Sequence, residues 1–530
     1  MAEVKKKTTT KENSSSKKAS ASKTTDKKVT AKTTAKKTST VSKKTAVSKK
    51  IPEIKVTKKK KIVFLGSEAA PFIATGGLAD VLGSLPKALA KNEKLDVSVI
   101  LPLYSSINPE FKKEFTFLTN FNVSVSWRLQ YCGVFYYEYQ GVKFYFIDNE
   151  FYFKREGNIY GFYDDGERFA FFSRAALDTI ARLNIYPDIL HCNDWQTAAS
   201  IIYLKGMYYN DENFKKIKSV FTIHNIEYQG KFSMDTYSDL FGFPESIHNF
   251  VEFDNCVNLM KGAIEMTDIV STVSPTYAEE IKNPFFAHGL ESIINRNARK
   301  LSGILNGIDI DYYNPETDKY LFKNYSIDDL SGKAVCKREL QKMLGLPIKE
   351  DVPVIAIISR LVSHKGLDLV KEVLENLLVD DVQVVILGKG ETYYENYFTN
   401  VANNYKGKCS TVIAYNQDLS RKIYSGADIF LMPSKMEPCG LSQMIASRYG
   451  TVPVVRETGG LNDSIKAYTG DNGNGFTFHD YNAYDMLYVI NEAIRTFKNK
   501  DAWKDVLRRA MTTDFSWNGL ASKYEELYNK

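Results

Sequence analysis

The stretch VPVIAIISRLVSHKGLDLVKEVLENLL, residues 352–378, decides the fold class. Its first part is apolar and rich in β-branched residues, which is typical of a buried strand. A short polar loop follows, and then Leu and Val recur at helical spacing. Because parallel strands need a crossover connection, a strand followed by a helix predicts a parallel neighbour. The same unit recurs along the chain, with further apolar strands at 382–388, 410–415, 429–433 and 452–458 and helices between them.

An earlier series of the same kind begins at Lys61. Apolar strands are predicted at 61–68, 96–104, 188–194, 219–225 and 268–272, and the alternation within 114–149 predicts antiparallel strands. The two series join near LNGIDIDYYNPETD, 305–318. We therefore expect an α/β protein with two doubly wound, Rossmann-like domains that face a cleft. The expected parts are a tail over 1–60, domains over 61–305 and 306–500, and a helix over 501–530 that returns to the first domain.

The first 60 residues differ in composition from the rest. They hold 20 Lys and four acidic residues, a balance of +16, so subtraction from the total of +7 leaves −9 for residues 61–530. The tail consists almost entirely of Lys, Thr, Ser and Ala, and such a segment cannot offset its ordering entropy by burial. We expect it to be disordered. Two interpretations stay open: a plastid transit peptide, or a solvated basic tail that binds anionic partners weakly and without specificity for nucleic acid.

Length and cysteine usage bound the class of protein. A chain of 530 residues is too long for one core, which predicts two or more domains. The six Cys show no CxxC pair, which indicates free thiols in a reducing compartment. No apolar run reaches 18 residues, so we expect no membrane span. The sequence therefore predicts a cytoplasmic protein, with a plastid location as the alternative.

Polar residues that directly follow strands are the candidate site, because open parallel sheets bind ligands beyond the carboxyl ends of their strands. In the first series these are Gly76–Gly77, Asp194 and His224. The glycines allow close backbone approach to a ligand, but a plain tight turn explains them as well. Asp194 is either a helix cap or an anchor for a sugar hydroxyl with the Trp195 indole nearby. His224 is either a structural group or part of the site.

In the second series the candidates are Arg360 and Lys365 after the opening strand, and Glu437 in MPSKMEPCGLSQ, 432–443. Two cations on one loop at a sheet edge suit a diphosphate, because Arg offers a bidentate fork and Lys a point charge. A solvated basic loop is the alternative. Glu437 by itself also fits an ordinary helix start. A second TGGL, at 458–461, offers further backbone N–H groups to phosphate.

Other classes of site lack support in the sequence. There is no GxGxxG fingerprint, no Walker lysine and no Gly-x-Ser-x-Gly. The six His are scattered without an HExxH motif. The DID at 309–311 has the short pattern of metal-dependent sugar transferases, but it lies in the connection between the domains, and we interpret it as a chance match. We expect no metal and no cofactor.

These motifs occur together in one family. In this order they are EAAPFIATGGLADVLGSLPKAL (68–89), YGFYDDGERFAFFSRAAL (160–177), NDWQTA (193–198), FTIHNIEYQG (221–230), STVSPTYAEEI (271–281), SGILNGIDIDYYNPETD (302–318), SRLVSHKGLDLV (359–370), SKMEPCGLSQM (434–444), VRETGGLNDS (455–464), NGFTF (474–478) and DFSW (514–517). The sequence resembles bacterial glycogen synthases and plant starch synthases, which are retaining glucosyltransferases of the two-domain GT-B type. The resemblance covers residues 61–530 and excludes the tail.

The resemblance implies a reaction and a set of roles. Glucose would pass from ADP-glucose to the non-reducing end of an α-1,4-glucan, with the acceptor on the first domain and the nucleotide sugar on the second. Glu437 would orient the donor glucose, Arg360 and Lys365 would neutralise the leaving diphosphate, and Asp194 and His224 would line the glucose pocket. The residues implied in substrate binding are Gly76, Gly77, Asp80, Asn306, Tyr415 (stacked on adenine), Cys439, Gly440, Leu441, Ser442, Thr458, Gly459 and Gly460.

One departure from the family stands at Ala74, where the family has a lysine before TGGL. Its absence leaves Arg360 and Lys365 with more of the donor charge to neutralise. Three alternative functions stay open: a UDP-glucose-dependent retaining transferase acting on a small acceptor, a glucan-binding protein with impaired catalysis, and a pyridoxal-phosphate-dependent phosphorylase of the same architecture.

Overall fold

The computed structural model of the chain describes residues 58–530, and the expectations for the tail lie outside them. Within this range the first sheet has nine strands in the order β12-β11-β7-β6-β1-β2-β5-β4-β3. All neighbours are parallel except β3–β4 and β4–β5, which confirms the antiparallel strands expected in 114–149. The strands are β1 (Lys60–Leu65), β2 (Leu95–Pro102), β3 (Thr116–Val125), β4 (Arg128–Tyr139), β5 (Val142–Asp148), β6 (Ile189–Asn193), β7 (Lys218–Ile223), β11 (Ile269–Thr272) and β12 (Leu301–Gly303).

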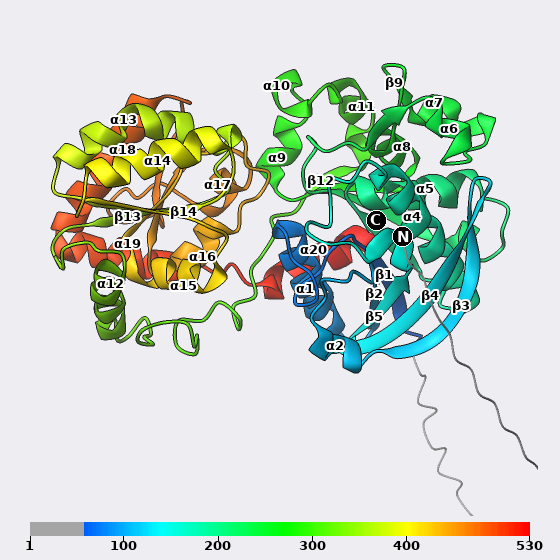
Figure 1. The fold of residues 1–530 in the computed structure, drawn as a ribbon, viewed down its shortest axis with the longest axis horizontal. Coiled ribbons are helices and arrows are strands. Elements are labelled where there is room, and N and C mark those ends of the chain that lie inside the picture. Colours follow the sequence, from blue (N-terminus) through cyan, green and yellow to red (C-terminus); the bar gives the residue numbers. More distant parts are fainter. Residues whose placement is uncertain (1–57) are drawn as a thin grey trace, which may run out of the picture. The chain divides into compact units, whose positions relative to one another are not determined.

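Helices connect these strands and enclose an apolar core (Figure 1). The main ones are α1 (Gly77–Ala90), α4 (Asp165–Arg182), α5 (Trp195–Gly206), α8 (Leu259–Met266) and α9 (Pro275–Glu280). Shorter elements are α2 (Pro109–Lys113), α3 (Glu150–Phe153), η1 (Phe214–Lys216), α6 (Thr236–Asp239), η2 (Glu245–Ile247), α7 (His248–Val251), α10 (Pro284–Ala287), α11 (Glu291–Arg296), η3 (Ala298–Lys300), and the small antiparallel sheet of β8 (Lys231–Ser233), β9 (Glu252–Phe253) and β10 (Cys256–Asn258).

The second sheet is entirely parallel, with the order β15-β14-β13-β16-β17-β18. Its strands are β13 (Val354–Ile358), β14 (Gln383–Gly388), β15 (Cys409–Ile413), β16 (Ile429–Met432), β17 (Val452–Arg456) and β18 (Phe476–Phe478). Its helices are α12 (Ser331–Met343), η4 (Ser363–Lys365), α13 (Leu367–Val379), α14 (Thr392–Asn404), α15 (Gln417–Gly426), α16 (Ser442–Arg448), α17 (Gly459–Ser464), α18 (Ala483–Lys498) and α19 (Lys500–Thr512). Two doubly wound sheets confirm the expected fold class.

The strand order reverses at one place in each sheet. β1 lies between β2 and β6, so the chain builds one side of the first sheet and then returns to the other. β13 likewise lies between β14 and β16. At such a switch point the loops after two adjacent strands diverge to opposite faces and leave a crevice for a ligand. The loops after β1 and β6, and those after β13 and β16, are therefore the expected ligand positions.

The C-terminal segment differs from the single returning helix expected over 501–530. Residues 500–512 form α19, whose apolar side chains belong to the core of the second sheet. The chain then bends at 513–516 and forms α20 (Trp517–Asn529), which packs on α1 of the first sheet (Figure 1). The Tyr528 hydroxyl is 2.8 Å from Nδ1 of the buried His191. The return to the first sheet thus begins at Trp517.

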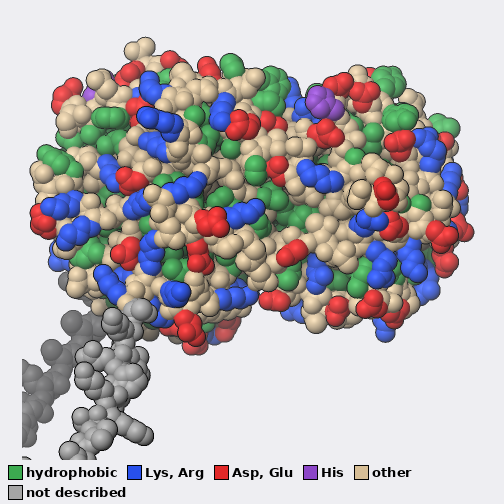
Figure 2. Space-filling view, turned by 180° about the vertical axis from the view of Figure 1, so that it is seen from behind, with side chains coloured by type: hydrophobic (Ala, Val, Ile, Leu, Met, Phe, Trp, Pro, Cys, Tyr) green, Lys and Arg blue, Asp and Glu red, His purple; other side chains and the backbone are tan. Residues whose placement is uncertain are grey.

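Acidic and basic side chains are interspersed over the face shown in Figure 2, without a region of one sign. This mixture is consistent with the small negative balance of residues 61–530. Among residues 58–530, no helix has the length and apolar character needed to cross a membrane. The six cysteines are all free thiols, five of them buried.

Candidate functional site

The switch point of the second sheet brings Lys365 and Glu437 together. Lys365 lies in the loop after β13, and Glu437 follows β16. Their Nζ and Oε2 atoms are 2.6 Å apart, and only 14% and 8% of the two side chains are exposed. The Ser434 hydroxyl donates to the same carboxylate oxygen at 2.9 Å. Arg360, from the same loop as Lys365, is exposed and pairs with no carboxylate in the described range.

A glycine makes this approach of two loops possible. Gly366 has φ of +72°, and a Cβ placed on it would lie 1.9 Å from the carbonyl oxygen of Pro433. Any side chain at this position would separate the loop after β13 from the loop after β16. Lys365 is therefore placed beside Glu437 by a backbone-to-backbone contact one residue further along the chain.

The loop from Glu437 to Ser442 leads into α16. Cys439 is buried, and Gly440 has φ of +71°. Ser442 begins α16. Gln443 Oε1 is buried beside Gly440 and has no hydrogen-bond partner. An unpartnered buried acceptor is rare in proteins and marks a place where a ligand can supply the missing donor.

The predicted phosphate contacts of Thr458, Gly459 and Gly460 are engaged within the protein. The Thr458 hydroxyl and the Gly459 N–H donate to Glu280 Oε1 at 2.8 and 3.0 Å. The Gly460 N–H donates to the Glu437 carbonyl at 3.2 Å. Donor binding by these groups stays a prediction, and in this structure they hold the loop that carries Glu437.

Asp194 and His224 meet at the switch point of the first sheet. Asp194 Oδ1 accepts the backbone N–H of His224 at 2.7 Å, and His224 Nε2 lies 2.9 Å from Asn193 Oδ1. Asp194 has φ of 56° and ψ of 177°, a region that glycine favours. Strained backbone of this kind is concentrated at functional sites. The carboxylate makes no cap hydrogen bond to α5, so the helix-cap interpretation of Asp194 is wrong.

Burial sets the charge of this pair. Desolvation raises the pKa of Asp194 to about 7, against the hydrogen bonds from His224 and Asn225 that favour the carboxylate. Burial lowers the pKa of His224 to about 3, so the imidazole is neutral near pH 7. The Trp195 indole packs edge-on against Phe169 and close to Phe232, and a sugar hydroxyl bound by Asp194 beside this ring stays a prediction.

The turn before α1 adds two further carboxylates. Glu68, at the end of the segment that forms β1, is buried and accepts the N–H and hydroxyl of Thr75 at 2.5 and 2.8 Å. Burial raises its pKa to about 7 and that of Asp80 to about 6. The sequence interpretation omitted Glu68, although it is a polar residue directly after a strand and meets the same criterion as Asp194 and Glu437.

Contacts between loops of the two domains bring the candidate residues of the first sheet close to those of the second. A Cβ on Gly77 would lie 3.8 Å from Leu441 Cδ1, so the turn before α1 faces the loop after β16. The backbone of Asn306, in the connection between the domains, interacts with the Cys439 thiol. Asn306 Oδ1 is buried without a partner. The Tyr415 ring is 77% exposed, but partial desolvation of its hydroxyl raises the pKa, and the charges of Asp80 and Glu68 add to this effect.

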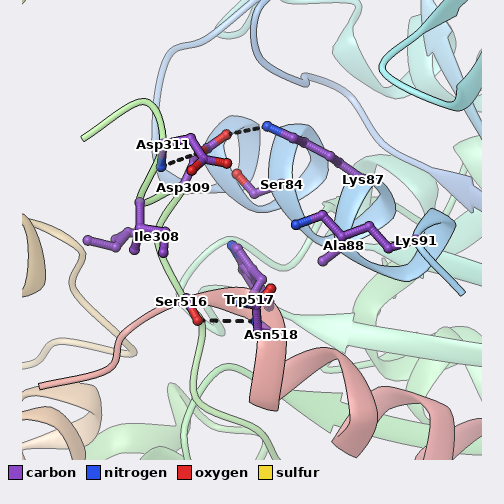
Figure 3. Close-up of a pocket in the computed structure, with 11 residues that line it drawn as sticks. Ser84, Lys87, Ala88, Lys91, Ile308, Asp309, Asp311, Ser516, Trp517 and Asn518 are labelled. Atoms are coloured by element: carbon purple, nitrogen blue, oxygen red, sulfur yellow. Dashed lines mark hydrogen bonds and ion pairs between the residues drawn. The ribbon is translucent and has the colours of Figure 1, made fainter. Parts of the chain in front are cut away.

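The DID motif has a structural role. Asp309 accepts Lys87 Nζ and the backbone N–H groups of Asp311 and Tyr312, each at 3.0 Å. It lies at a pocket of about 90 Å³ where the two connections between the sheets meet α1 and α20 (Figure 3). The pattern is a turn held to α1 by an ion pair. Among residues 58–530, no group of three or more His, Cys, Asp or Glu side chains is arranged to hold a metal ion.

Comparisons with known proteins assign these features to a family. Residues 61–296 match the model of the starch synthase catalytic domain, and residues 341–507 match that of the group 1 glycosyl transferases. Two curated relatives are named glycogen synthase. That of Desulforamulus reducens is 48% identical over 475 residues, which is 89% of this chain and 98% of the relative. That of Clostridium acetobutylicum is 50% identical over 475 residues, with 88% and 99% covered.

Solved structures agree with the sequence relatives. The catalytic domain of starch synthase IV from Arabidopsis thaliana, bound to ADP and acarbose, matches with a TM-score of 0.83 at 34% identity, covering 89% of this chain and 99% of that one. Sucrose-phosphate synthase from Thermosynechococcus elongatus matches with a TM-score of 0.56 at 14% identity, which shows a shared fold.

Proposed function

Since the chain belongs to the glycogen synthase and starch synthase family of GT-B glycosyltransferases, we propose that it transfers glucose from ADP-glucose to the non-reducing 4-hydroxyl of an α-1,4-glucan, with retention of configuration. The observation that carries this proposal is the Lys365–Glu437 pair at the switch point of the second sheet. The starch synthase of the same fold holds ADP and acarbose, a nucleotide and a glucan analogue, which supports the same two ligand classes here.

The departing diphosphate needs positive charge, and Lys365 and Arg360 supply it from one loop. Arg360 is free to meet the phosphates, whereas Lys365 is shared with Glu437. Removing one preorganised partner of a developing charge typically costs about 3–4 kcal/mol in the transition state. Glu437 orients the glucose and keeps Lys365 close to the leaving group. Lys365 therefore links the recognition of the sugar to that of the diphosphate.

The anomeric carbon becomes positively charged during transfer, and the first sheet tolerates this charge. His224 is neutral near pH 7, so it adds no opposing cation. Its N–H is held by Asp194, which fixes the backbone so that the His224 carbonyl can face the reacting carbon. We propose a same-face displacement in which a donor phosphate oxygen takes the proton of the acceptor hydroxyl. This reaction needs no cofactor besides the donor.

Turnover of ADP-glucose on glycogen tests the proposal, with wild type, Glu437→Ala and Arg360→Ala compared after circular dichroism has shown that each is folded. We expect rates about 100- to 1,000-fold below wild type in both variants. Parallel assays with UDP-glucose and small acceptors test the alternative transferase, and any turnover excludes a purely glucan-binding role. Pyridoxal-phosphate absorbance in the purified protein would indicate the phosphorylase. Near-normal rates in either variant would contradict the site.

We also propose a cytoplasmic location, because none of the six cysteines forms a disulfide and the relatives named above are bacterial synthases. Fractionation of the source cells with an antibody against the chain tests this, and recovery in an organelle fraction would contradict it.

A further inference from the structure

Helix α9 of the first sheet lies against α17 of the second (Figure 1). The Ser274 hydroxyl, which caps α9, donates to the Pro438 carbonyl at 2.8 Å. Thr276 donates its N–H and its hydroxyl to the Asp463 carboxylate at 2.9 and 2.7 Å. At the other end of α9, Glu280 accepts the Thr458 hydroxyl and the Gly459 N–H. All these hydrogen bonds join the domain of the first sheet to the domain of the second sheet.

The turn that Glu280 binds is packed directly on the loop that carries Glu437. A Cβ on Gly459 would lie 2.0 Å from the Glu437 carbonyl oxygen, and one on Gly460 would lie 2.2 Å from that of Cys439. The Gly460 N–H also donates to the Glu437 carbonyl. Because backbone touches backbone without intervening side chains, a shift of the turn moves residues 437–439 with it.

The Glu280 side chain is half-buried and only partly satisfied. Its Oε1 accepts both hydrogen bonds, whereas its Oε2 is buried and has no partner. Burial raises the pKa of the Glu280 carboxyl, against the hydrogen bonds from Gly459 and Thr458 and the charge of Arg456, which favour the carboxylate. Leaving one carboxylate oxygen unsatisfied is unfavourable for folding. Such a group is retained where it serves a purpose other than stability.

We propose that Glu280 is a positioning residue, which holds the Thr458–Gly459 turn from the domain of the first sheet and thereby strengthens the hold of this turn on the Glu437 loop. This inference rests on the proposed function, because Glu437 orients the donor glucose there. The contact couples the exclusion of water from the site to the placement of Glu437.

Kinetics of matched variants test the proposal. Glu280→Ala removes both hydrogen bonds, and we expect kcat to fall about 10- to 100-fold, as misplacement of a catalytic group does. KM for ADP-glucose should change less than about threefold, because Arg360 and Lys365 bind the diphosphate from the second sheet alone. Glu280→Gln keeps an oxygen at the Oε1 position and should stay within about threefold of wild type.

The control is Glu279→Ala, which makes the same charge change on the same helix. Glu279 is exposed and, among residues 58–530, pairs only with Lys282 on its own segment, so its loss should leave kcat unchanged. Thr458→Val removes one donor to Glu280 and should lower kcat as well. In the double variant with Glu280→Ala the losses should not add, because both changes remove the same hydrogen bond.

Hydrogen exchange without substrate separates this inference from the proposed function. We expect Glu280→Ala and Thr458→Val to exchange faster at 436–442 than wild type, with unchanged exchange in α19 and in the Glu279→Ala control. If wild type fails to use ADP-glucose but the exchange result holds, the function is wrong and the coupling stands. Either of two results would overturn the inference. One is a wild-type kcat in Glu280→Ala. The other is an equal loss of kcat in Glu280→Ala and Glu280→Gln, with hydrogen exchange at 436–442 unchanged.

Discussion

Replacing Asp194 by Asn should stabilise the protein at high pH and leave it unchanged at low pH. Burial raises the pKa of Asp194 from 3.8 to about 7, so the fold favours the protonated form. Below pH 4 the group is protonated in both folded and unfolded chains and adds no penalty. Between about pH 4 and 7 the unfolded chain is ionised at this group whereas the folded protein keeps the proton, so stability falls over this range and is constant above it. Three pKa units correspond to about 4 kcal/mol, and partial exposure of the side chain reduces this to about 2–3 kcal/mol.

Scanning calorimetry at pH 4, 6 and 8 measures this effect. A gain of 2–3 kcal/mol should raise the unfolding midpoint of the first domain by about 4–9 °C at pH 8. Asn Oδ1 can accept the same N–H groups of His224 and Asn225, and Asn tolerates the positive φ of this position. The stabilised variant should lose glucosyl transfer, since Asp194 is predicted to bind the donor sugar.

Asp268→Asn is the matched control, because the pKa of Asp268 is shifted in the opposite direction to that of Asp194. Burial acts to raise the pKa of Asp268, but hydrogen bonds from Lys205 and Ser219 overcome it and hold the pKa below its ordinary value. This carboxylate therefore stabilises the fold above about pH 4, and its removal should lower the midpoint at pH 8. Equal shifts of Asp194→Asn at pH 4 and pH 8 would show relief of backbone strain instead of charge burial. No shift at pH 8 would refute the reasoning.

Three further predictions concern the donor site. Lys365→Met and Glu437→Gln should each lower the free energy of unfolding in urea by about 3–5 kcal/mol, because each leaves a buried charge unpaired. The double variant should recover part of this loss, and additive losses would contradict the buried pair. Tyr415→Ala should raise KM for ADP-glucose about tenfold through lost stacking on the adenine. Because the ring is exposed, the free energy of unfolding should stay within about 0.5 kcal/mol of wild type. An unchanged KM would exclude adenine stacking. Ala74→Lys should lower KM for ADP-glucose about two- to fivefold at low salt and less at high salt. A change in KM that does not depend on salt would argue against contact with phosphate.

Most strands of the two large sheets were predictable from the sequence because they are short apolar runs, whereas the three-residue strands β12 and β18 were not. Asp194, His224, Arg360, Lys365 and Glu437 follow from the rule that ligands lie beyond strand ends. The order of the strands was not predictable, because it depends on packing between segments far apart in the chain, such as Ile62 with Ile189 and Ile355 with Ile429. That order decides which loops are neighbours. Glu437 lies beside Lys365 because β16 pairs with β13, and no local pattern in either loop indicates this pairing.

Two features show where local patterns went unused or gave too little. The break at 513–516 had a signal, since Ser516 is a good helix N-cap and accepts the Asn518 N–H. The glycines at 459 and 460 had none. Their sequence matches the turn at 76 and 77, yet Gly459 and Gly460 pack on carbonyls of a distant loop. Only the tertiary structure distinguishes a glycine that admits a ligand from one that admits another backbone.

The site of the second sheet depends on glycine in a way that explains its geometry. Lys365 and Glu437, which meet at 2.6 Å, lie in loops after two different strands, and these loops also touch through their backbones. Gly366 allows this on one side, because its Cα lies against the Pro433 carbonyl, and Gly459 allows it on the other, against the carbonyl of Glu437 itself. The Glu437 loop is therefore held from two sides by backbone contacts, and substituting either glycine by Ala would push residues 433–437 away from the donor phosphates. Charge at this site can be provided by several residue types, but the space that lets the charges meet can be provided only by glycine.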